Sequence, residues 1–205
     1  ERLMNAGPDF QEIVAEGVDA GLWARSDEGS YRFQQDLLRH ALEEMQLSAR
    51  LQELHSRASS LLQQLHPNDP SLQADLAYHY IRAGMPTEAG QALRNAADYA
   101  LENFKNEKAL EFLESYQSYA ESLDDRIRAY RDMASVYELT GKWAGAIDTL
   151  TYAVGLSVIT NNLAARGRLL TNLGEVYRKQ SEIKTAVAIL EQARQLAKRE
   201  QDWST

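Results

Sequence analysis

The strongest constraint on the fold of this chain is a pattern of small, aliphatic and aromatic residues that occurs three times. Its last copy is Leu173-Gly174-x-x-Tyr177, followed by Ala186, Leu190 and Ala193. The same steps occur 40 residues earlier, from Met133 to Ala153, and once more from Leu76 to Ala96. A short loop-forming segment stands between the Tyr and the first Ala of each copy. Each copy therefore predicts two antiparallel helices, with small residues where the helices approach closely.

This pattern resembles the tetratricopeptide (TPR) repeat family, whose usual period is about 34 residues. The resemblance implies an all-α fold, a right-handed superhelix of antiparallel helix pairs. The second repeat is irregular, and the simplest account is that one helix closes the first repeat and opens the second. The helices expected in this region lie at about 87–104, 107–121, 126–139, 143–157, 163–179 and 183–199.

The first 66 residues have a different pattern. A helix is expected from Asp9 to Ala20, because apolar residues recur at helical spacing after Pro8. Two short aromatic-bearing stretches flank the turn at residues 26–30 and indicate a β-hairpin. Helices are then expected at about 35–45 and 47–65, an order typical of the end of a winged-helix fold. Pro67 and Pro70 separate this part from the repeats, so we expect domains at 1–66 and 67–205.

The segment from Tyr31 to Leu62 resembles the winged-helix exit of signal-transduction ATPases with numerous domains (the STAND class). The matching residues are Tyr31, Phe33, Leu47, Ser48, Arg50, Leu54 and His55, whereas Gln35 stands where the family usually has His. The resemblance implies a protein-interaction or sensor segment of a multidomain signalling ATPase or transcriptional regulator. ATP would then bind in an upstream domain that this chain lacks. The alternatives are a stand-alone TPR adaptor or scaffold protein and a DNA-binding winged-helix regulator.

No catalytic or metal site is expected in the sequence. The chain has no cysteine and no phosphate-binding Gly-x-x-x-x-Gly-Lys-Ser/Thr motif, and its four histidines have no ligand-like spacing. His55 is expected to be a packed structural residue. We therefore expect no enzyme activity and no cofactor. The absence of long apolar runs and of a signal peptide favours a soluble, cytoplasmic protein. Because the chain begins at Glu1 without Met, we expect it to be a piece of a longer protein.

Charge argues against nucleic acid as the partner. The chain carries a net charge of −8, of which residues 1–66 and 67–122 each contribute −5, whereas residues 123–205 carry +2. A DNA-reading helix needs basic and amide side chains to face the phosphates and bases. The helix expected at 9–20 carries four acidic residues and neither Lys nor Arg. DNA binding is therefore the weakest of the three functional readings.

Candidate binding residues lie on the first helices of the last two repeats, which line the concave face in the TPR resemblance. They are Arg128, Arg131, Ser135 and Glu138 in the third repeat, and Arg168, Thr171, Asn172, Glu175 and Lys179 in the fourth. Asn172 matches a place where many TPR proteins use an Asn to hold a peptide backbone, because an amide can donate and accept at once. With Arg178, the basic residues of this face predict an acidic or carboxylate-bearing peptide partner. The alternative is that Asn172 only bridges neighbouring helices and that the arginines are solvated.

The final helix is expected to pack on its own partner through Ile183, Ala186, Val187, Leu190 and Ala197. Ile189 and Leu196 would then point toward a following repeat. Because the ends of repeat arrays need polar caps, this apolar face predicts further repeats or self-association through residues 183–199.

Overall fold

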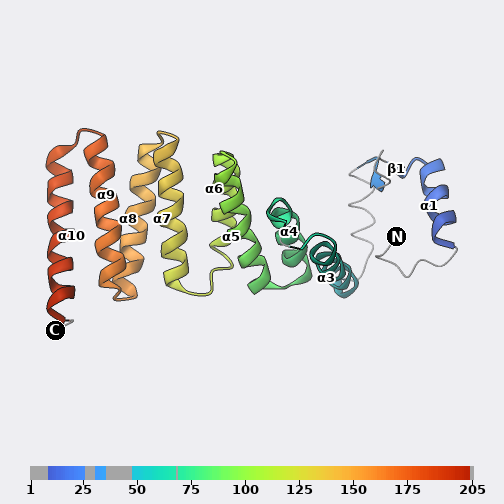
Figure 1. Cartoon of the computed structure of the whole chain (residues 1–205), viewed down its shortest axis with the longest axis horizontal. Coiled ribbons are helices and arrows are strands. Elements are labelled where there is room, and N and C mark those ends of the chain that lie inside the picture. The colour runs from blue at the N-terminus through green and yellow to red at the C-terminus, as the bar shows by residue number, and fades with distance from the viewer. Residues whose placement is uncertain (1–8, 26–30, 36–47, 68, 204–205) are drawn as a thin grey trace. The chain divides into compact units, whose positions relative to one another are not determined.

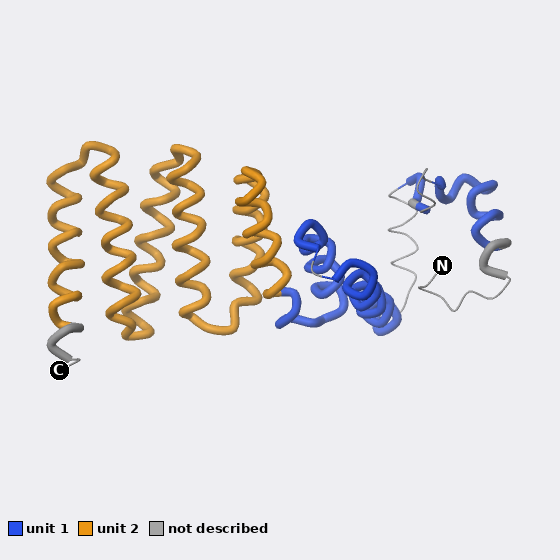
Figure 2. Tube along the Cα trace, viewed as in Figure 1, with its two compact units in different colours: residues 1–89 blue, residues 90–205 orange. Residues whose placement is uncertain are grey.

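The structure, a computed structural model, describes residues 9–25, 31–35, 48–67 and 69–203 (Figure 1). It divides into two compact units, residues 1–89 and 90–205 (Figure 2). Each unit is described by itself below. No helix in the described part of the chain combines the length and the apolar character needed to cross a membrane.

The first unit opens with a helix and a two-stranded sheet. Helix α1 (Asp9–Asp19) precedes strands β1 (Trp23–Arg25) and β2 (Tyr31–Phe33), which pair antiparallel with Trp23 opposite Phe33. The indole of Trp23 donates a hydrogen bond of 3.0 Å to the carbonyl of Val14 in α1. Gly17 makes this contact possible, since a Cβ there would lie 2.3 Å from the indole ring. The expected helix and hairpin are confirmed, whereas the helix expected at 35–45 lies outside the described residues.

Two further helices lie wholly within the described residues of the first unit. Helix α3 (Ser48–Leu65) packs against α4 (Gln73–Ala83), and the short 3₁₀ helix η1 (Pro70–Leu72) lies between them in sequence. The carboxylate of Asp69 caps η1 by accepting a hydrogen bond of 2.9 Å from the amide of Ser71. Helix α4 ends at Gly84, whose φ of 71° gives the left-handed cap for which glycine is preferred.

The second unit is a row of helices joined by short turns. The elements are α5 (Pro86–Glu102), whose first residues belong to the first unit, α6 (Asn106–Tyr116), α7 (Leu123–Leu139), α8 (Trp143–Ile159), α9 (Leu163–Lys179) and α10 (Ile183–Trp203). Helices α7 to α10 pack in chain order, each against the next (Figure 1). The turn between α8 and α9 uses Asn161 in a left-handed conformation, and Asn162 caps α9 by accepting from the amide of Ala165.

The repeated residues form the core, as expected. Among them, Ala134, Ala146, Leu150, Ala153 and Leu173 are buried together in one cluster. Tyr137 and Tyr177 pack against its edge. Gly174 shows why small residues recur, because a Cβ there would lie 2.7 Å from Cγ of Leu190 in the facing helix. The helix-pair register is therefore confirmed.

Two helix boundaries differ from the expected ones. Helix α6 ends at Tyr116, before residue 121, because the chain then turns through three successive bonds between residues three apart, ending with Tyr119 N–H to Tyr116 O. Helix α7 begins at Leu123, before residue 126. The hydroxyl of Ser122 accepts a hydrogen bond from the amide of Asp125 and donates one to its carboxylate. This Ser-x-x-Asp capping arrangement is a start signal readable in the sequence.

The expected packing face of α10 is confirmed at Ala186 and Leu190, which lie against α9, and is wrong at Ile183, Val187 and Ala197. Ile183 and Val187 are 55% and 61% exposed, and Ala197 is exposed as well, whereas Ile189 packs against the core. The face of α10 that packs on the interior carries Ala186, Ile189 and Ala193. One repeat earlier, Trp143 and Ile147 occupy the positions of Ile183 and Val187 and pack against the core. The open face of the last pair therefore carries Ile183 and Val187, and self-association through residues 183–199 stays a prediction.

Helix α8 differs from its neighbours in composition. Asp148 is its single charged residue, and its outer side exposes Tyr152, Val158 and Ile159. Tyr152 stacks edge-on against Tyr130 of α7 with 4.8 Å between the ring centroids.

Candidate functional site

The second unit contains a groove of about 490 Å³ lined by residues of α7, α9 and α10. One side chain comes from α7 and most come from α9. The lining residues are Arg131, Leu163, Ala164, Gly167, Arg168, Thr171, Asn172, Ala193 and Ala197. The floor is thus made of small and aliphatic residues, and cationic and amide groups border it. This volume lies within the usual range of ligand pockets.

The groove brings together three of the seven expected site residues, namely Arg131, Arg168 and Asn172. Thr171, also expected on this face, joins them. Its hydroxyl donates to the carbonyl of Gly167 within α9, at 3.0 Å. The remaining expected residues do not line the groove, and they are Arg128, Ser135, Glu175 and Lys179.

Most of the expected basic side chains are already paired with carboxylates. Arg128 pairs with Asp125, Arg178 with Glu175, and Lys179 of α9 with Glu138 of α7, at 2.6 Å between Nζ and Oε2. These cations are therefore accompanied by acids, and the acidic partner expected from the sequence stays a prediction. The long basic side chains reach a carboxylate one turn away on the same helix or, for Lys179, on the first helix of the preceding repeat. In each pair the two opposite charges neutralise each other.

Several of these groups have shifted pKa values. The hydrogen bond from the Ser122 hydroxyl lowers the pKa of the Asp125 carboxyl, and the contact with Arg128 lowers it further. Burial acts in the opposite direction but is outweighed, so this pKa lies below its ordinary value. The hydrogen bond to Glu175 raises the pKa of Arg178. Ser135 donates its hydroxyl to the carbonyl of Arg131, so this side chain is also engaged within its own helix. These groups are committed to internal contacts rather than presented to a ligand.

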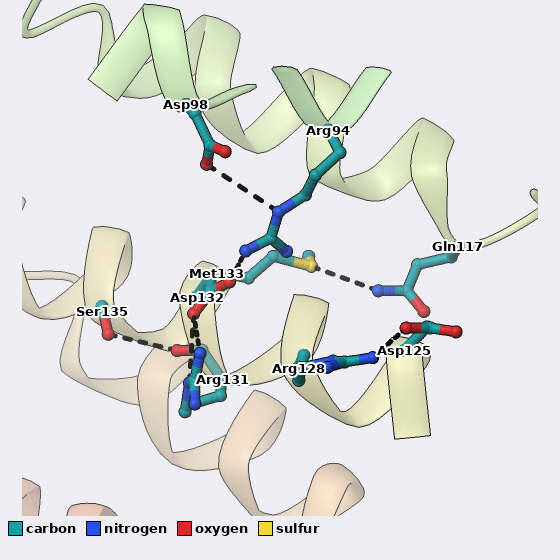
Figure 3. A network of polar contacts seen from close by, with 9 residues as sticks. All are labelled: Arg94, Asp98, Gln117, Asp125, Arg128, Arg131, Asp132, Met133 and Ser135. Carbon is teal, nitrogen blue, oxygen red and sulfur yellow. Dashed lines mark hydrogen bonds and ion pairs between the residues drawn. The ribbon is translucent and has the colours of Figure 1, made fainter. Parts of the chain in front are cut away.

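Arg131 is held in place from a neighbouring helix (Figure 3). The carboxylate of Asp132 accepts two hydrogen bonds from Arg131, at 3.1 and 2.9 Å, and one from Arg94 of α5 at 2.5 Å. Asp132 is half-buried between them. Asp98 lies near Arg94, and burial raises the pKa of its carboxyl. Arg131 therefore reaches the groove in a fixed orientation, which lowers the entropy lost on binding.

Arg168 and Asn172 differ from these residues. Within the described part of the chain, neither side chain makes a hydrogen bond or an ion pair. An exposed guanidinium and a half-buried amide thus stand about one turn apart on α9, both facing the groove. An unpaired guanidinium favours a carboxylate, and an amide can bind a peptide group through its donor and its acceptor.

A pair of histidines in the first unit was not expected from the sequence. Nδ1 of His55 in α3 lies 2.9 Å from Nδ1 of His79 in α4, and the ring of Tyr78 stands against both imidazoles. Burial, and then the neighbouring His55, lower the pKa of His79, although Asp75 acts in the opposite direction. His55 is packed, as expected. No group of three potential metal ligands occurs among the described residues.

Comparisons with known proteins bear on the fold. No protein-family model matches the sequence, and no curated protein matches it either. Among solved structures, RapI aligns with a TM-score of 0.50 and 13% identity, over 82% of this chain and 63% of RapI. MamA aligns with a TM-score of 0.47 and 15% identity over 77% of this chain and 98% of its own. A kinesin light chain of Podosopora anserina with nearly identical TPR-like repeats aligns with a TM-score of 0.47 and 20% identity, over 82% of this chain and 94% of its own.

At these identities the likeness concerns the fold alone. The chain folds as an all-α array of TPR-like helix pairs.

Proposed function

We propose that the chain binds a peptide segment of a partner protein in the groove between α7, α9 and α10. TPR-like helix pairs form a protein-interaction fold, because stacked repeats present an extended surface to a partner. The observation that carries the proposal is that Arg168 and Asn172 stand side by side in the groove and that neither side chain has a polar partner among the described residues.

The chemistry of the groove favours a partner with a carboxylate. Arg168 offers a planar fork of donors, and Asp132 orients Arg131 toward the same groove. A carboxylate placed between the two guanidinium groups would accept charge-assisted hydrogen bonds, which are shorter and stronger than neutral ones. The amide of Asn172 would bind the backbone of the same segment. An acidic peptide is therefore the preferred class of ligand.

A displayed library of random peptides, selected on the immobilised chain, tests this proposal. Selected peptides are expected to be rich in Asp or Glu. Arg168→Glu should weaken their binding by at least about tenfold, and by less at high salt, because one charge-assisted contact is worth roughly 1.5–3 kcal/mol.

Arg194→Glu is the matched control, since Arg194 is exposed on α10 and lies outside the groove. Selected peptides that bind wild type and Arg168→Glu equally well would contradict a role for the groove. Failure to select any peptide would contradict peptide binding itself.

The wider setting is also a proposal. Helix α1 with the β1–β2 hairpin, followed by α3 and the repeats, supports an interaction or sensor segment of a signalling ATPase or transcriptional regulator over a stand-alone adaptor. A phosphate-binding loop encoded upstream of Glu1 in the parent gene would support the ATPase, and its absence would favour the adaptor. DNA binding remains the weakest alternative, because the described outer side of α1 presents Glu16 and Asp19.

A further inference from the structure

Gly167 occupies a position that a large side chain fills one repeat earlier. The residue 40 positions before it is Ile127, which is 4% exposed and belongs to the buried cluster that contains Ala153 of α8. At Gly167, by contrast, no heavy atom lies within 4 Å of the place that a Cβ would take. Equivalent positions of the repeat are thus filled by an isoleucine side chain in the α7–α8 pair and left empty in the α9–α10 pair.

The residues opposite Gly167 are equivalent as well. Ala193 and Ala197 of α10 line the groove together with Gly167. They correspond to Ala153 and Ser157 of α8, both of which are buried. Ala193 is buried like Ala153, whereas Ala197 is exposed at the position where Ser157 is buried. The later pair is therefore open at Ala197, and the groove forms an apolar hole over Gly167.

The packing gives no reason for glycine at this position. Gly167 lies inside a helix, where glycine costs about 1 kcal/mol relative to alanine, and it has neither a positive φ nor a close neighbour. What the missing side chain creates is space. Arg168 follows directly in the sequence, and Thr171 stands one turn further along the same face. The space is therefore bordered by a cation that no acid pairs with in the described part of the chain.

We propose that the hole over Gly167 is a subsite for a large aliphatic side chain of the partner, next to the carboxylate subsite at Arg168. The inference rests on the proposed function and specifies its ligand. The bound segment carries a Leu, Ile or Val side chain on the residue that bears the carboxylate or on its immediate neighbour. The aliphatic group takes the place that Ile127 occupies in the earlier repeat, and the charge of Arg168 is matched by the ligand.

Three small probes separate the two subsites. N-acetyl-L-leucine carries a branched side chain, an amide and a carboxylate, whereas N-acetylglycine lacks the side chain and N-acetyl-L-leucinamide lacks the charge. Titrations of the ¹⁵N-labelled chain are expected to shift the amide signals of Gly167, Arg168 and Thr171, with N-acetyl-L-leucine binding in about the millimolar range. Each of the other two probes should bind about tenfold more weakly or worse.

Gly167→Ile restores the residue type of the earlier repeat and fills the hole. It should abolish the shifts caused by N-acetyl-L-leucine and weaken library-selected peptides by about ten- to a hundredfold. Gly155→Ile is the matched control, because Gly155 is also a helix-interior glycine with open space over it but lies outside the groove. The control should bind like wild type, with circular dichroism confirming that both variants fold.

The outcomes distinguish this inference from the proposed function. Equal binding of N-acetyl-L-leucine and N-acetylglycine, or peptide binding that depends on Arg168 but is unchanged in Gly167→Ile, would overturn the aliphatic subsite and leave peptide binding intact. If no probe shifts these amides and no peptide is selected, both proposals fail.

Discussion

The helix pairs α7–α8 and α9–α10 share one 40-residue pattern but use it differently. Positions in helix–helix contact keep their character, as at Ala146 and Ala186, both of which are buried. Positions that face the groove change. Ile127 becomes Gly167, and Asp132, which is bound by two arginines, becomes Asn172, which has no partner among the described residues.

This difference shows how a repeat can acquire a binding site without a change of fold. The earlier pair fills this position with Ile127, and its Asp132 is bound by Arg131 and by Arg94 of α5. The later pair keeps the same backbone register but leaves a space, an amide and a guanidinium unmatched. Because repeats contact mainly their neighbours, such changes in one pair have small effects on the rest of the array.

The first prediction tests whether the contact positions are equivalent in the two pairs. Ala146→Asp and Ala186→Asp each place an unpaired carboxylate at a site with 0% or 2% exposure. Each should lower the free energy of unfolding by several kcal/mol, roughly 3–5, through overpacking and desolvation. Thermal melts measure the loss, with Ala144→Asp and Ala188→Asp as controls because both alanines are exposed on the same helices. Unchanged melting temperatures of both buried variants would show that the register is wrong.

Two glycines in α9 should respond to the same substitution with opposite sign. Gly174→Ala should destabilise the chain by about 1–3 kcal/mol, because its Cβ would meet Leu190 at 2.7 Å. Gly167→Ala should stabilise it by about 0.5–1 kcal/mol, because the space is open and the unfolded chain loses freedom. Urea unfolding of the two variants gives the comparison. Destabilisation of both would mean that the hole over Gly167 is closed in solution.

A third and smaller effect concerns pH, which should change the stability of the first unit more than that of the second. Burial lowers the pKa of His79 from its ordinary value of 6.5. The unfolded chain therefore binds more protons than the folded one below pH 6.5, so the stability of the α3–α4 pair should fall as the pH drops below that value. The repeat helices α7 to α10 contain no histidine.

Amide hydrogen exchange at pH 7.5 and pH 5.5, corrected for intrinsic rates, measures this difference. Protection in α4 should decrease relative to α9 at the lower pH, and His79→Gln should remove most of the change. An equal response of both helices would contradict the assignment to the histidine pair.

The sequence predicts the helix pairs well, because close helix contacts restrict residue size. Gly174 and Ala186 could be placed in the core for this reason, and the bounds of α9 follow from its polar cap and its apolar period. The shorter α6 and the earlier start of α7 depend on local hydrogen bonds. Of these, the cap at Ser122 was readable, whereas the turn after Tyr116 was not.

The candidate site was harder to predict. Arg131, Arg168 and Asn172 could be placed on one face from helical spacing. Which of the basic side chains are paired with acids could not be predicted. For example, the pair between Lys179 and Glu138 joins residues 41 positions apart through flexible side chains. The contact between His55 and His79 depends likewise on how α3 packs against α4. The change from Ile127 to Gly167 was present in the aligned repeats, but its meaning requires the groove.

The composition of α8 has a consequence for folding. With one charged residue in its length and with Tyr152 and Ile159 already exposed, it depends on α7 and α9 to cover its remaining apolar faces. Opening of the array at the α8–α9 contact therefore releases the least charged helix of the row into water. Such partly open states are prone to aggregation. The rate at which α9 packs over α8 during folding therefore affects how much of the chain aggregates before it reaches the native state.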